Sequence, residues 1–491
     1  MSAYKSRSWN RLEATGEFSL VARDGSAGKI HTAAMYLEAL FDRFAQKSPV
    51  TVMTRALMEN ALAPEALDEI FAKHAELQYE RTLLFSSVVD LMGLVVCKVQ
   101  PAVSSAYRAV KDTLPVSLTA LYDKINGIEG EVSAALVRHT GERLGAIVEA
   151  MGAQHPALLP GYRVKIIDGN HFAATERRLA VLRQCKAGPL PGHALVILDP
   201  ALMLATDMIP CEDGHAQERS LFSQVLARVC PGEFWLGDRN FCTVGFLHGI
   251  LKQRSFFGIR QHANFPVASE GPLRRRGRCA TGEVFEQSVT FLGEDGRPVE
   301  IRRILVRLYK PTRDGDTEIA ILTNVPPHDA SAVKLAELYQ ERWTLEGLFQ
   351  TLTQILDGEI PSLGYPKAAL FAFSVALVSY NIASVIRAAL RAKFGHEKVE
   401  REISGYYIAN EVRATSTGMD LALDEVAWEP FRAMPPKEMA RKLLEYAGHA
   451  RLDAFKRTPR GPKKPVPPRT KHTTETHVST ARLLAEVGMK Q

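Results

Sequence analysis

The chain lacks the cysteine patterns of disulfide-rich and zinc-binding proteins. Its six cysteines stand singly along 491 residues, no C-x-x-C motif occurs, and no cysteine–histidine cluster has the spacing of zinc ligands. Single cysteines spread over a large chain fit a reducing cytosol. The cysteine distribution therefore argues against a structural zinc site and favours a cytoplasmic protein.

Long apolar runs are also scarce. The first 16 residues contain no apolar core of signal-peptide length, and the run at 88–96 is too short to cross a bilayer. The run at 369–386 approaches the required length, but it leads into Arg387 and is interrupted by the polar residues Ser374, Ser379, Asn381 and Ser384. We therefore predict a buried core helix there and expect no membrane partner.

Charged residues of both signs are plentiful, with a modest basic excess. The 61 Lys and Arg against 55 Asp and Glu leave a net charge of +6 and a pI near 8.9. Part of this excess is concentrated at 456–471, which holds seven basic residues, five prolines and no acid. Such a segment cannot bury a core and is predicted to be an extended basic tail. A basic stripe favours an anionic partner such as nucleic acid.

The length exceeds what one hydrophobic core supports, so about two or three domains are expected. The texture changes at Gly161, from helical periodicity to apolar, β-branched strands that alternate with helices. We predict an α/β protein with a mixed sheet. The expected organisation is a flexible arm at 1–28, a helical domain at 29–155, an α/β domain at 160–365 with a β-rich insertion at about 255–325, a helical region at 366–450 and a basic tail at 451–491.

Several strands are predicted within the α/β domain. The stretch YRVKIIDGNHF at 162–172 has the character of a core strand that ends in Asp168, and EFWLGDRNF at 233–241 that of a short strand that ends in Asp238. Between them, LAVLRQCK at 179–186 and HALVILDPALMLATDMIP at 193–210 are predicted as two further strands, separated by a turn at Gly188-Pro189.

The stretch YQERWTLEGLFQ at 339–350 is predicted to form one amphipathic helix, with an apolar stripe on one side. Tyr339, Arg342 and Glu346 fall at i, i+3 and i+7, so they share one face. Such a row is either an ordinary solvated surface or a device that holds a phosphate beside a metal ion. Trp343 is expected to lie in the core rather than to stack on a base.

Asp168, Asp238 and Glu346 are the candidate functional acids. Open α/β sheets place their sites outside the carboxyl ends of the strands. Two strand-end acids and a third on a packing helix can form an oxygen cluster for divalent metals that carry out phosphoryl transfer. The alternative is that each aspartate caps a turn, or that paired carboxylates serve a hydrolase such as a glycosidase, which explains neither the basic tail nor the Tyr–Arg pair.

Three short motifs together resemble a known family. These are DGN at 168–170, DRNF at 238–241 and the Y-x2-R-x3-E spacing of Tyr339, Arg342 and Glu346. They are similar to motifs of the DDE transposases of bacterial insertion sequences, in the group with a Tyr–Arg–Glu–Lys signature, insertion-sequence family four. The order of the parts, from a helical N-terminal domain to a β-rich insertion before the glutamate, also resembles that family over about 30–450.

The resemblance implies an RNase H-like catalytic core in which Asp168, Asp238 and Glu346 bind two Mg²⁺ or Mn²⁺ ions. It implies a bacterial enzyme that nicks double-stranded DNA at transposon terminal inverted repeats, often through a hairpin, and joins the freed 3′-hydroxyl to target DNA in cut-and-paste transposition. A homodimer is expected because two DNA ends must be paired, and helical N-terminal elements are expected to bind DNA.

The same resemblance implies DNA contacts. Tyr339 and Arg342 match positions that hold DNA phosphate, for which a hydroxyl and a guanidinium fork are suitable donors. Further candidate DNA-binding residues are Arg239, Arg274, Arg275 and Arg276. The arginine run 274–278 is otherwise interpreted as a solvated turn.

One position departs from the signature. The family's lysine lies seven residues after the glutamate, where this chain has Thr353. A threonine cannot supply the point charge of a lysine to a phosphate. The alternative hypothesis is therefore a catalytically impaired, transposase-derived protein that still binds DNA.

Overall fold

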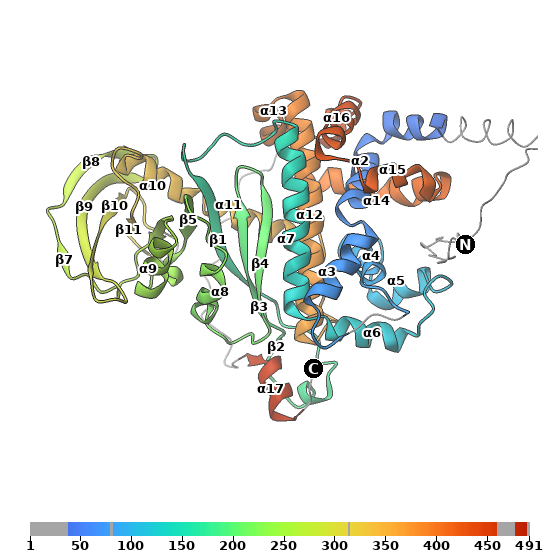
Figure 1. Ribbon diagram of the computed structural model, residues 1–491, viewed down its shortest axis with the longest axis horizontal. Coiled ribbons are helices and arrows are strands. Elements are labelled where there is room, and N and C mark those ends of the chain that lie inside the picture. Colours follow the sequence, from blue (N-terminus) through green and yellow to red (C-terminus); the bar gives the residue numbers. More distant parts are fainter. Residues whose placement is uncertain (1–37, 79–81, 313–314, 459–476, 489–491) are drawn as a thin grey trace, which may run out of the picture. The chain divides into compact units, whose positions relative to one another are not determined.

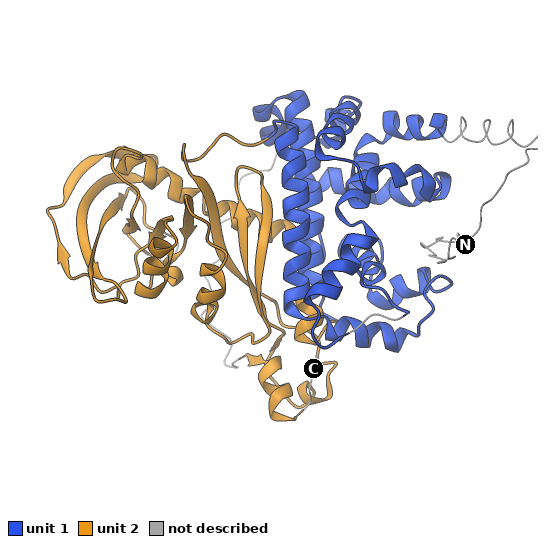
Figure 2. Cartoon of the chain, in the orientation of Figure 1, with its two compact units in different colours: residues 1–153, 354–362, 371–475 blue, residues 154–353, 363–370, 476–491 orange. Residues whose placement is uncertain are grey.

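The computed structural model describes residues 38–78, 82–312, 315–458 and 477–488 (Figure 1). The predicted arm at 1–28 and most of the basic segment 456–471 lie outside this range. The chain divides into two compact units, coloured separately in Figure 2. Unit 1 comprises 1–153, 354–362 and 371–475, and unit 2 comprises 154–353, 363–370 and 476–491. Each unit is thus assembled from stretches that are far apart in the sequence.

Unit 1 is built from helices. They are α2 (Pro49–Ala61), α3 (Pro64–His74), α4 (Phe85–Val96), α5 (Val103–Ala109), α6 (Leu118–Gly127), α7 (Gly130–Ala150), most of α12 (Pro366–Phe394), α13 (His396–Glu402), α14 (Gly405–Ala422), α15 (Glu429–Arg432) and α16 (Pro436–Ala447). Proline occupies the first turn of α2 and α3, where its missing N–H costs no hydrogen bond. Helix α2 packs against α7, α14, α15 and α16.

Helix α12 is the apolar segment that was predicted to be a core helix. It is the one described helix whose length and composition would suffice to cross a membrane, and 89% of its most apolar window is buried within the protein. Ser374 and Asn381 are completely buried along with its apolar side chains. The prediction of a buried helix is confirmed.

Unit 2 contains a mixed ten-stranded sheet in the order β4-β3-β1-β5-β6-β11-β10-β9-β7, with β8 also paired to β9. Its strands are β1 (Arg163–His171), β3 (His193–Asp199), β4 (Leu204–Cys211), β5 (Glu233–Gly237), β6 (Phe256–Arg260), β7 (Ser269–Glu270), β8 (Arg274–Cys279), β9 (Gly282–Leu292), β10 (Pro298–Leu308) and β11 (Glu318–Thr323). The pairs β1–β5 and β5–β6 are parallel, and the others are antiparallel. The predicted mixed α/β class is confirmed.

Two predicted strands need correction. The stretch 179–186 contains a short 3-10 helix, Ala180–Leu182, in place of a strand. The stretch 193–210 holds two antiparallel strands, β3 and most of β4, where one was predicted. Strand β3 is buried along its whole length and is therefore apolar. In the sequence, Asp199 and Pro200 mark the turn between the two strands.

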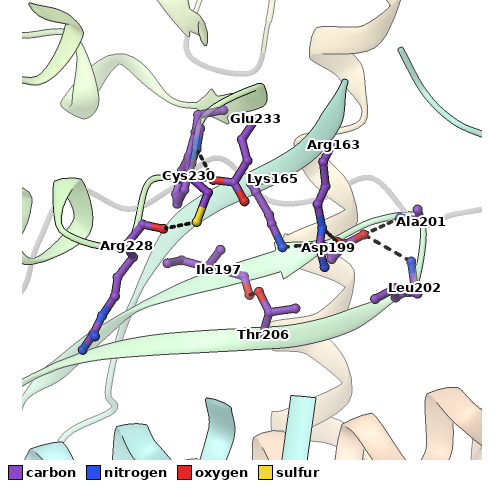
Figure 3. Close-up of polar contacts among 11 residues, drawn as sticks. Arg163, Lys165, Ile197, Asp199, Ala201, Leu202, Thr206, Arg228, Cys230 and Glu233 are labelled. Atoms are coloured by element: carbon purple, nitrogen blue, oxygen red, sulfur yellow. Dashed lines mark hydrogen bonds and ion pairs between the residues drawn. The ribbon is translucent and has the colours of Figure 1, made fainter. Parts of the chain in front are cut away.

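Asp199 closes the turn between β3 and β4 (Figure 3). Its Oδ1 accepts hydrogen bonds from the backbone N–H groups of Ala201 and Leu202, at 3.1 and 3.3 Å. Its Oδ2 pairs with Arg163 Nε at 2.9 Å and Lys165 Nζ at 3.2 Å, both from β1. The turn is therefore stabilised by a nearly buried carboxylate with two cationic partners, which periodicity does not reveal.

The hydrophobic core of unit 2 lies on one face of the sheet. Helices α8 (Phe222–Leu226) and α9 (Val244–Lys252) pack there against alternate residues of the strands, such as Ile167, Leu195, Trp235 and Ile259. Helix α10 (Ala332–Gln340) packs against β8, β9 and β10. A short strand β12 (Val478–Ser479) and α17 (Thr480–Glu486) complete unit 2, with β12 paired to β2 (Pro189–Leu190).

Candidate active site

The register of three parallel strands aligns the candidate residues at one end of the sheet. Ile166 of β1 pairs with Leu236 of β5, and Gly237 of β5 pairs with Ile259 of β6. Asp168 and Asp238 each follow the Ile166–Leu236 pair by two residues, so they occupy equivalent positions along neighbouring segments of the sheet. Arg260 and Asp238 each follow the last β5–β6 pair by one residue. The carboxyl end of these strands is where open α/β sheets place their sites.

Asp168 was predicted to end its strand, but it lies inside β1. Strand β1 continues to His171, and Asp168 pairs across the sheet with Val196 of β3. On the other side, the described pairing with β5 stops at Ile166, because β5 ends at Gly237. Asp168 is thus at an end only with respect to β5, and that open side brings it close to Asp238.

The predicted single helix at 339–350 is two helices. Helix α10 ends at Gln340, and α11 (Trp343–Gln354) begins three residues later. The amides of Glu341, Arg342 and Thr344 donate to carbonyls three residues earlier, the tighter 3-10 spacing. Neither glycine nor proline occurs in this turn. The tertiary contact made at the break is the ion pair between Arg342 and Asp168.

Arg342 joins the acid on β1 to the acid on α11. Its Nη1 lies 2.6 Å from Asp168 Oδ2, and its Nη2 lies 3.2 Å from Glu346 Oε1. The Arg342 and Asp168 side chains are 14% and 18% exposed, whereas Glu346 is 49% exposed. The buried Nε of Arg342 has no hydrogen-bond partner within the described residues. The guanidinium therefore holds both carboxylates at once.

Tyr339 is buried at the end of α10, close to Arg342. Burial raises the pKa of its hydroxyl to about 12, although the positive charge of Arg342 acts in the opposite direction. The hydroxyl thus keeps its proton at neutral pH and can donate a hydrogen bond.

Trp343 is 53% exposed, which contradicts the prediction that it is a core residue. With Tyr309 it lines a cavity of about 450 Å³. Its position as the first residue of α11 explains the difference.

Two acidic or amide residues at this site were missed by the sequence analysis. Glu218 lies in the connection between β4 and β5, and its Oε2 accepts a hydrogen bond from Asn240 Nδ2 at 3.2 Å. The backbone N–H of Asn240 in turn donates to Asp238 Oδ1 at 2.7 Å. Asn240 belongs to the DRNF motif and could have been noticed there. Glu218 has no signal in the sequence, because only folding brings its loop to β1.

Arg260 was also missed. It ends β6, and its guanidinium pairs with Asp316 at 2.7 Å while its positive charge reaches Tyr339. Its position after the apolar strand FFGI was available from the sequence, by the reasoning that selected Asp168 and Asp238.

The carboxyls in this region carry uncompensated negative charge. Burial raises the pKa of Asp168 to about 6; the charges of Asp238 and Glu346 act in the same direction, and Arg342 opposes them. Burial also raises the pKa of Glu218 to about 7, again with contributions from Asp238 and Asp168. Both groups would therefore gain from a nearby cation.

The donor set suits a hard divalent cation. Carboxylate oxygens are the ligands that Mg²⁺ prefers, and Asp168, Asp238, Glu218 and Glu346 supply only such oxygens. In the described part of the chain, however, no three His, Cys, Asp or Glu side chains are grouped closely enough to enclose an ion. Arg342 bridges two of these acids directly. The residues present fit a metal by chemistry, provided that the Arg342 contacts rearrange.

Three of the other predicted DNA-binding residues lie on β8, which pairs with β9 and is separated from β1 and β5 by several strands. Arg274, Arg275 and Arg276 form strand β8 and not the predicted turn. Arg275 pairs with Glu283 at 2.9 Å, and Arg276 pairs with Glu286 at 2.6 Å. The acids of β9 thus offset much of this basic run. Arg239 directly follows Asp238 and is exposed.

Thr353 lies near the end of α11 with its side chain exposed. Its hydroxyl donates to the carbonyls of Phe349 and Gln350, at 3.1 and 3.3 Å. The side chain is therefore folded back onto its own helix. It extends no positive charge towards a ligand.

Part of the chain matches a known protein family. Residues 160–382 match the family described as Transposase DDE domain. This span contains Asp168, Asp238 and Glu346, and the predicted resemblance to transposase DDE domains is confirmed at this level.

Two individual proteins are also similar. "Putative transposase y4zB" of Sinorhizobium fredii (strain NBRC 101917 / NGR234) is 30% identical over 131 residues, which are 26% of this chain and 34% of that protein. The match thus spans about a third of that relative's length. A solved structure, "Cryo-EM structure of piggyBac transposase synaptic complex with hairpin DNA", is 10% identical with a TM-score of 0.35, and the alignment covers 78% of this chain and 80% of that one.

Proposed function

We propose that this chain is a cut-and-paste transposase that cleaves double-stranded DNA at the terminal inverted repeats of a bacterial insertion sequence and joins the 3′ end to target DNA. The observation that carries the proposal is the contact of Arg342 with both Asp168 and Glu346, beside the register that aligns Asp168 with Asp238. Residues separated by more than a hundred positions meet as the motif resemblance requires. The match of 160–382 to transposase DDE domains supports the same function.

The strand order of the first half of the sheet supports an RNase H-like core. Strands β4, β3, β1, β5 and β6 are adjacent in that order, with β3 antiparallel to both neighbours and β1, β5 and β6 mutually parallel. In this arrangement β1 and β5 are adjacent, so an acid on β1 and an acid just after β5 lie on neighbouring strands. We assign the catalytic roles to Asp168 on β1 and Asp238 after β5.

Asp168, Asp238 and Glu346 would hold two Mg²⁺ or Mn²⁺ ions, which activate the attacking hydroxyl and stabilise the leaving oxygen in phosphoryl transfer. Arg342 has a second role before and during binding. In the free protein its guanidinium is paired with Asp168 and Glu346. With Asp168 and Glu346 holding a cation, the fork would be free for a DNA phosphate, which accepts the same paired N–H geometry.

Tyr339 and Arg260 support that phosphate contact. The Tyr339 hydroxyl remains protonated because its pKa is raised to about 12, so it acts as a donor and not as an acid. Arg260 adds a positive charge that reaches Tyr339, at a position that no signature residue occupies. We also assign Arg239 and the β8 arginines Arg274, Arg275 and Arg276 to the DNA backbone, as sequence-independent contacts.

The proposal is tested with DNA that flanks the gene, where inverted repeats are expected close to both sides. The purified full chain should nick labelled repeat ends in Mg²⁺ or Mn²⁺. Asp168→Ala, Asp238→Ala and Glu346→Ala should each lower cleavage below detection, because each removes a metal ligand, while DNA binding in a mobility-shift assay stays within a few-fold of the unchanged chain.

Asp316→Ala is the matched control, since it removes an acid from the same unit that pairs with Arg260 and not with the three candidate ligands. It should leave cleavage detectable. Cleavage at the normal rate by any of the three acid variants would contradict the site assignment. Failure of the unchanged chain to bind any flanking DNA would contradict the transposase function itself.

A second candidate function is favoured by Thr353, which stands where the signature has lysine and folds back onto α11. In this version the chain binds transposon DNA as a homodimer but cuts it poorly. Thr353→Lys should then raise cleavage and make the slope of log K against log salt steeper by about 0.9, the effect of one added phosphate contact. Thr351→Lys, two residues earlier on α11, is the control. Equal slopes for the two variants would show that the missing lysine is not the limitation.

A further inference from the structure

We propose that Glu218 is a fourth carboxylate of this site and helps to hold the divalent ions with Asp168 and Asp238. The inference rests on the proposed function, because it deepens the description of the same site. It assigns a role to a residue in a loop that carries none of the signature motifs. Three features of the structure support it.

The first is the close approach of Glu218 to the backbone of β1. Gly169 follows Asp168, and a Cβ built on Gly169 would lie 2.0 Å from Glu218 Oε1 and 2.9 Å from its Cδ. Any side chain at position 169 would therefore displace the carboxylate. The glycine of the DGN motif thus provides the room that places Glu218 directly against the residue that follows Asp168.

The second feature is a shared positioning residue. Asn240 donates from its side chain to Glu218 Oε2 at 3.2 Å and from its backbone N–H to Asp238 Oδ1 at 2.7 Å. One residue thereby fixes the orientation of two carboxylates from different loops. Hydrogen bonds of this kind commonly orient metal ligands and their neighbours.

The third feature is the lack of a strong cationic partner. The Glu218 side chain is only 10% exposed, and in the described part of the chain its ion-pair contact is His171 Nε2 at 3.9 Å. Asp168, by comparison, has Arg342 at 2.6 Å. A nearly buried carboxylate beside two others, without Lys or Arg, is unfavourable unless a cation is supplied. A divalent ion at the site would supply that charge.

The test measures thermal unfolding of the full chain with and without Mn²⁺. Glu218→Gln preserves the oxygen that accepts from Asn240 and removes only the charge. Without metal, its melting temperature should equal or exceed that of the unchanged chain, because a repulsive buried charge is gone. The Mn²⁺ concentration that gives half of the metal-induced rise should increase about tenfold or more.

Glu233→Gln is the matched control. Glu233 is also buried in unit 2 and accepts hydrogen bonds from Cys230 and from Trp235, but it lies at the opposite end of β5 from Asp238. This variant should lose stability without metal and keep the normal Mn²⁺ response. A merely structural role for Glu218 predicts the same behaviour for Glu218→Gln, so that result would overturn the inference.

Two further outcomes separate the inference from the function on which it rests. If the unchanged chain shows no Mn²⁺ response, the metal-dependent function fails, and the role of Glu218 fails with it. If the unchanged chain responds and Glu218→Gln responds equally, only the role of Glu218 is wrong. If Glu218→Gln does not fold, Asn240→Ala serves as the second variant, because Asn240 is exposed. Asn240→Ala must weaken the Mn²⁺ response. A normal response would again overturn the inference.

Discussion

Asp168 carries a carboxyl that burial holds in its protonated form to an unusually high pH. Its pKa is raised to about 6 from the ordinary 3.8, mainly by burial, despite the nearby Arg342. Because the folded pKa exceeds the unfolded one, the folded state binds more protons between these values, and stability falls as pH rises through that window. At neutral pH the ionised Asp168 therefore lowers the free energy of unfolding, as residues at functional sites often do.

Asp168→Asn should remove this penalty. In metal-free buffer near pH 7.5, the free energy of unfolding should rise by up to about 3 kcal/mol, and the gain should shrink as the pH falls from about 6 towards about 4. Urea unfolding at several pH values measures it. Asp199→Asn is the control of opposite sign: burial acts to raise the pKa of Asp199, but Lys165 and Arg163 outweigh it and lower the pKa, so this variant should be less stable at neutral pH. A loss of stability for Asp168→Asn would contradict the prediction.

At the scale of elements, polar side chains decide where helices end and how they pack. The break between α10 and α11 occurs at Arg342, whose partner lies on β1. In unit 1, α2 is tied to α7 and to the segment around α15 through Asn60. Its Nδ2 donates to the carbonyls of Phe431 and Met434, at 2.7 and 3.0 Å, and its Oδ1 accepts from Arg143 Nε at 3.0 Å. Asn60 is 2% exposed, so none of these groups can turn to water instead.

Asn60→Ala should therefore leave the Met434 carbonyl without its partner and remove one hydrogen bond each from the Phe431 carbonyl and from Arg143, whose Nε keeps the backbone carbonyl of residue 60 at 2.7 Å. We expect the free energy of unfolding to fall by about 2–4 kcal/mol, which is the cost of leaving one or two buried polar groups without a hydrogen bond. Chemical unfolding followed by circular dichroism measures the change. Asn410→Ala is the control, since half-buried Asn410 accepts from Arg413 of its own helix, and it should cost less than 1 kcal/mol on the same scale. Equal losses would show that the Asn60 contacts are not what holds these helices.

At the scale of the whole molecule, each unit is completed by distant segments. Residues 476–491 belong to unit 2 although unit 1 precedes them in the sequence. Strand β12 pairs with β2, Arg482 Nε lies 2.7 Å from Asp213 Oδ2, and Leu484 is buried. The connection at 459–476 lies outside the described residues. The last segment thus supports the sheet unit and not the helices that come before it.

Removal of 477–491 should weaken unit 2 selectively. Amide hydrogen exchange should rise around β2 and at 211–215, where contacts are lost, while α2 to α7 of unit 1 keep their protection. Mass spectrometry of peptides from the full and shortened chains measures both regions. Arg482→Ala should give a smaller increase at 211–215. Unchanged exchange at β2 after the deletion would contradict the assignment of the segment to this unit.

Much of the candidate site was predictable because it depends on local patterns. The strand character of 163–171 and of 233–237 follows from β-branched and aromatic residues, and the acids Asp168, within the first strand, and Asp238, after the second, stand out by position. The break at Arg342 was not predictable, because the chain there has helical propensity throughout and an ion pair to β1 decides the turn. Glu218 was not predictable because no spacing relates its loop to Asp168.

The sequence by itself determined the mixed α/β class and the buried α12, and it suggested Asp168, Asp238 and Glu346 as candidates, since each depends on composition, periodicity or motif order along the chain. Only the tertiary structure decided that Arg342 bridges two acids, that Arg260 pairs with Asp316 and that Gly169 makes room for Glu218. These are contacts between residues far apart in sequence. They follow from strand register and loop packing, which arise when separate segments bury their apolar faces together.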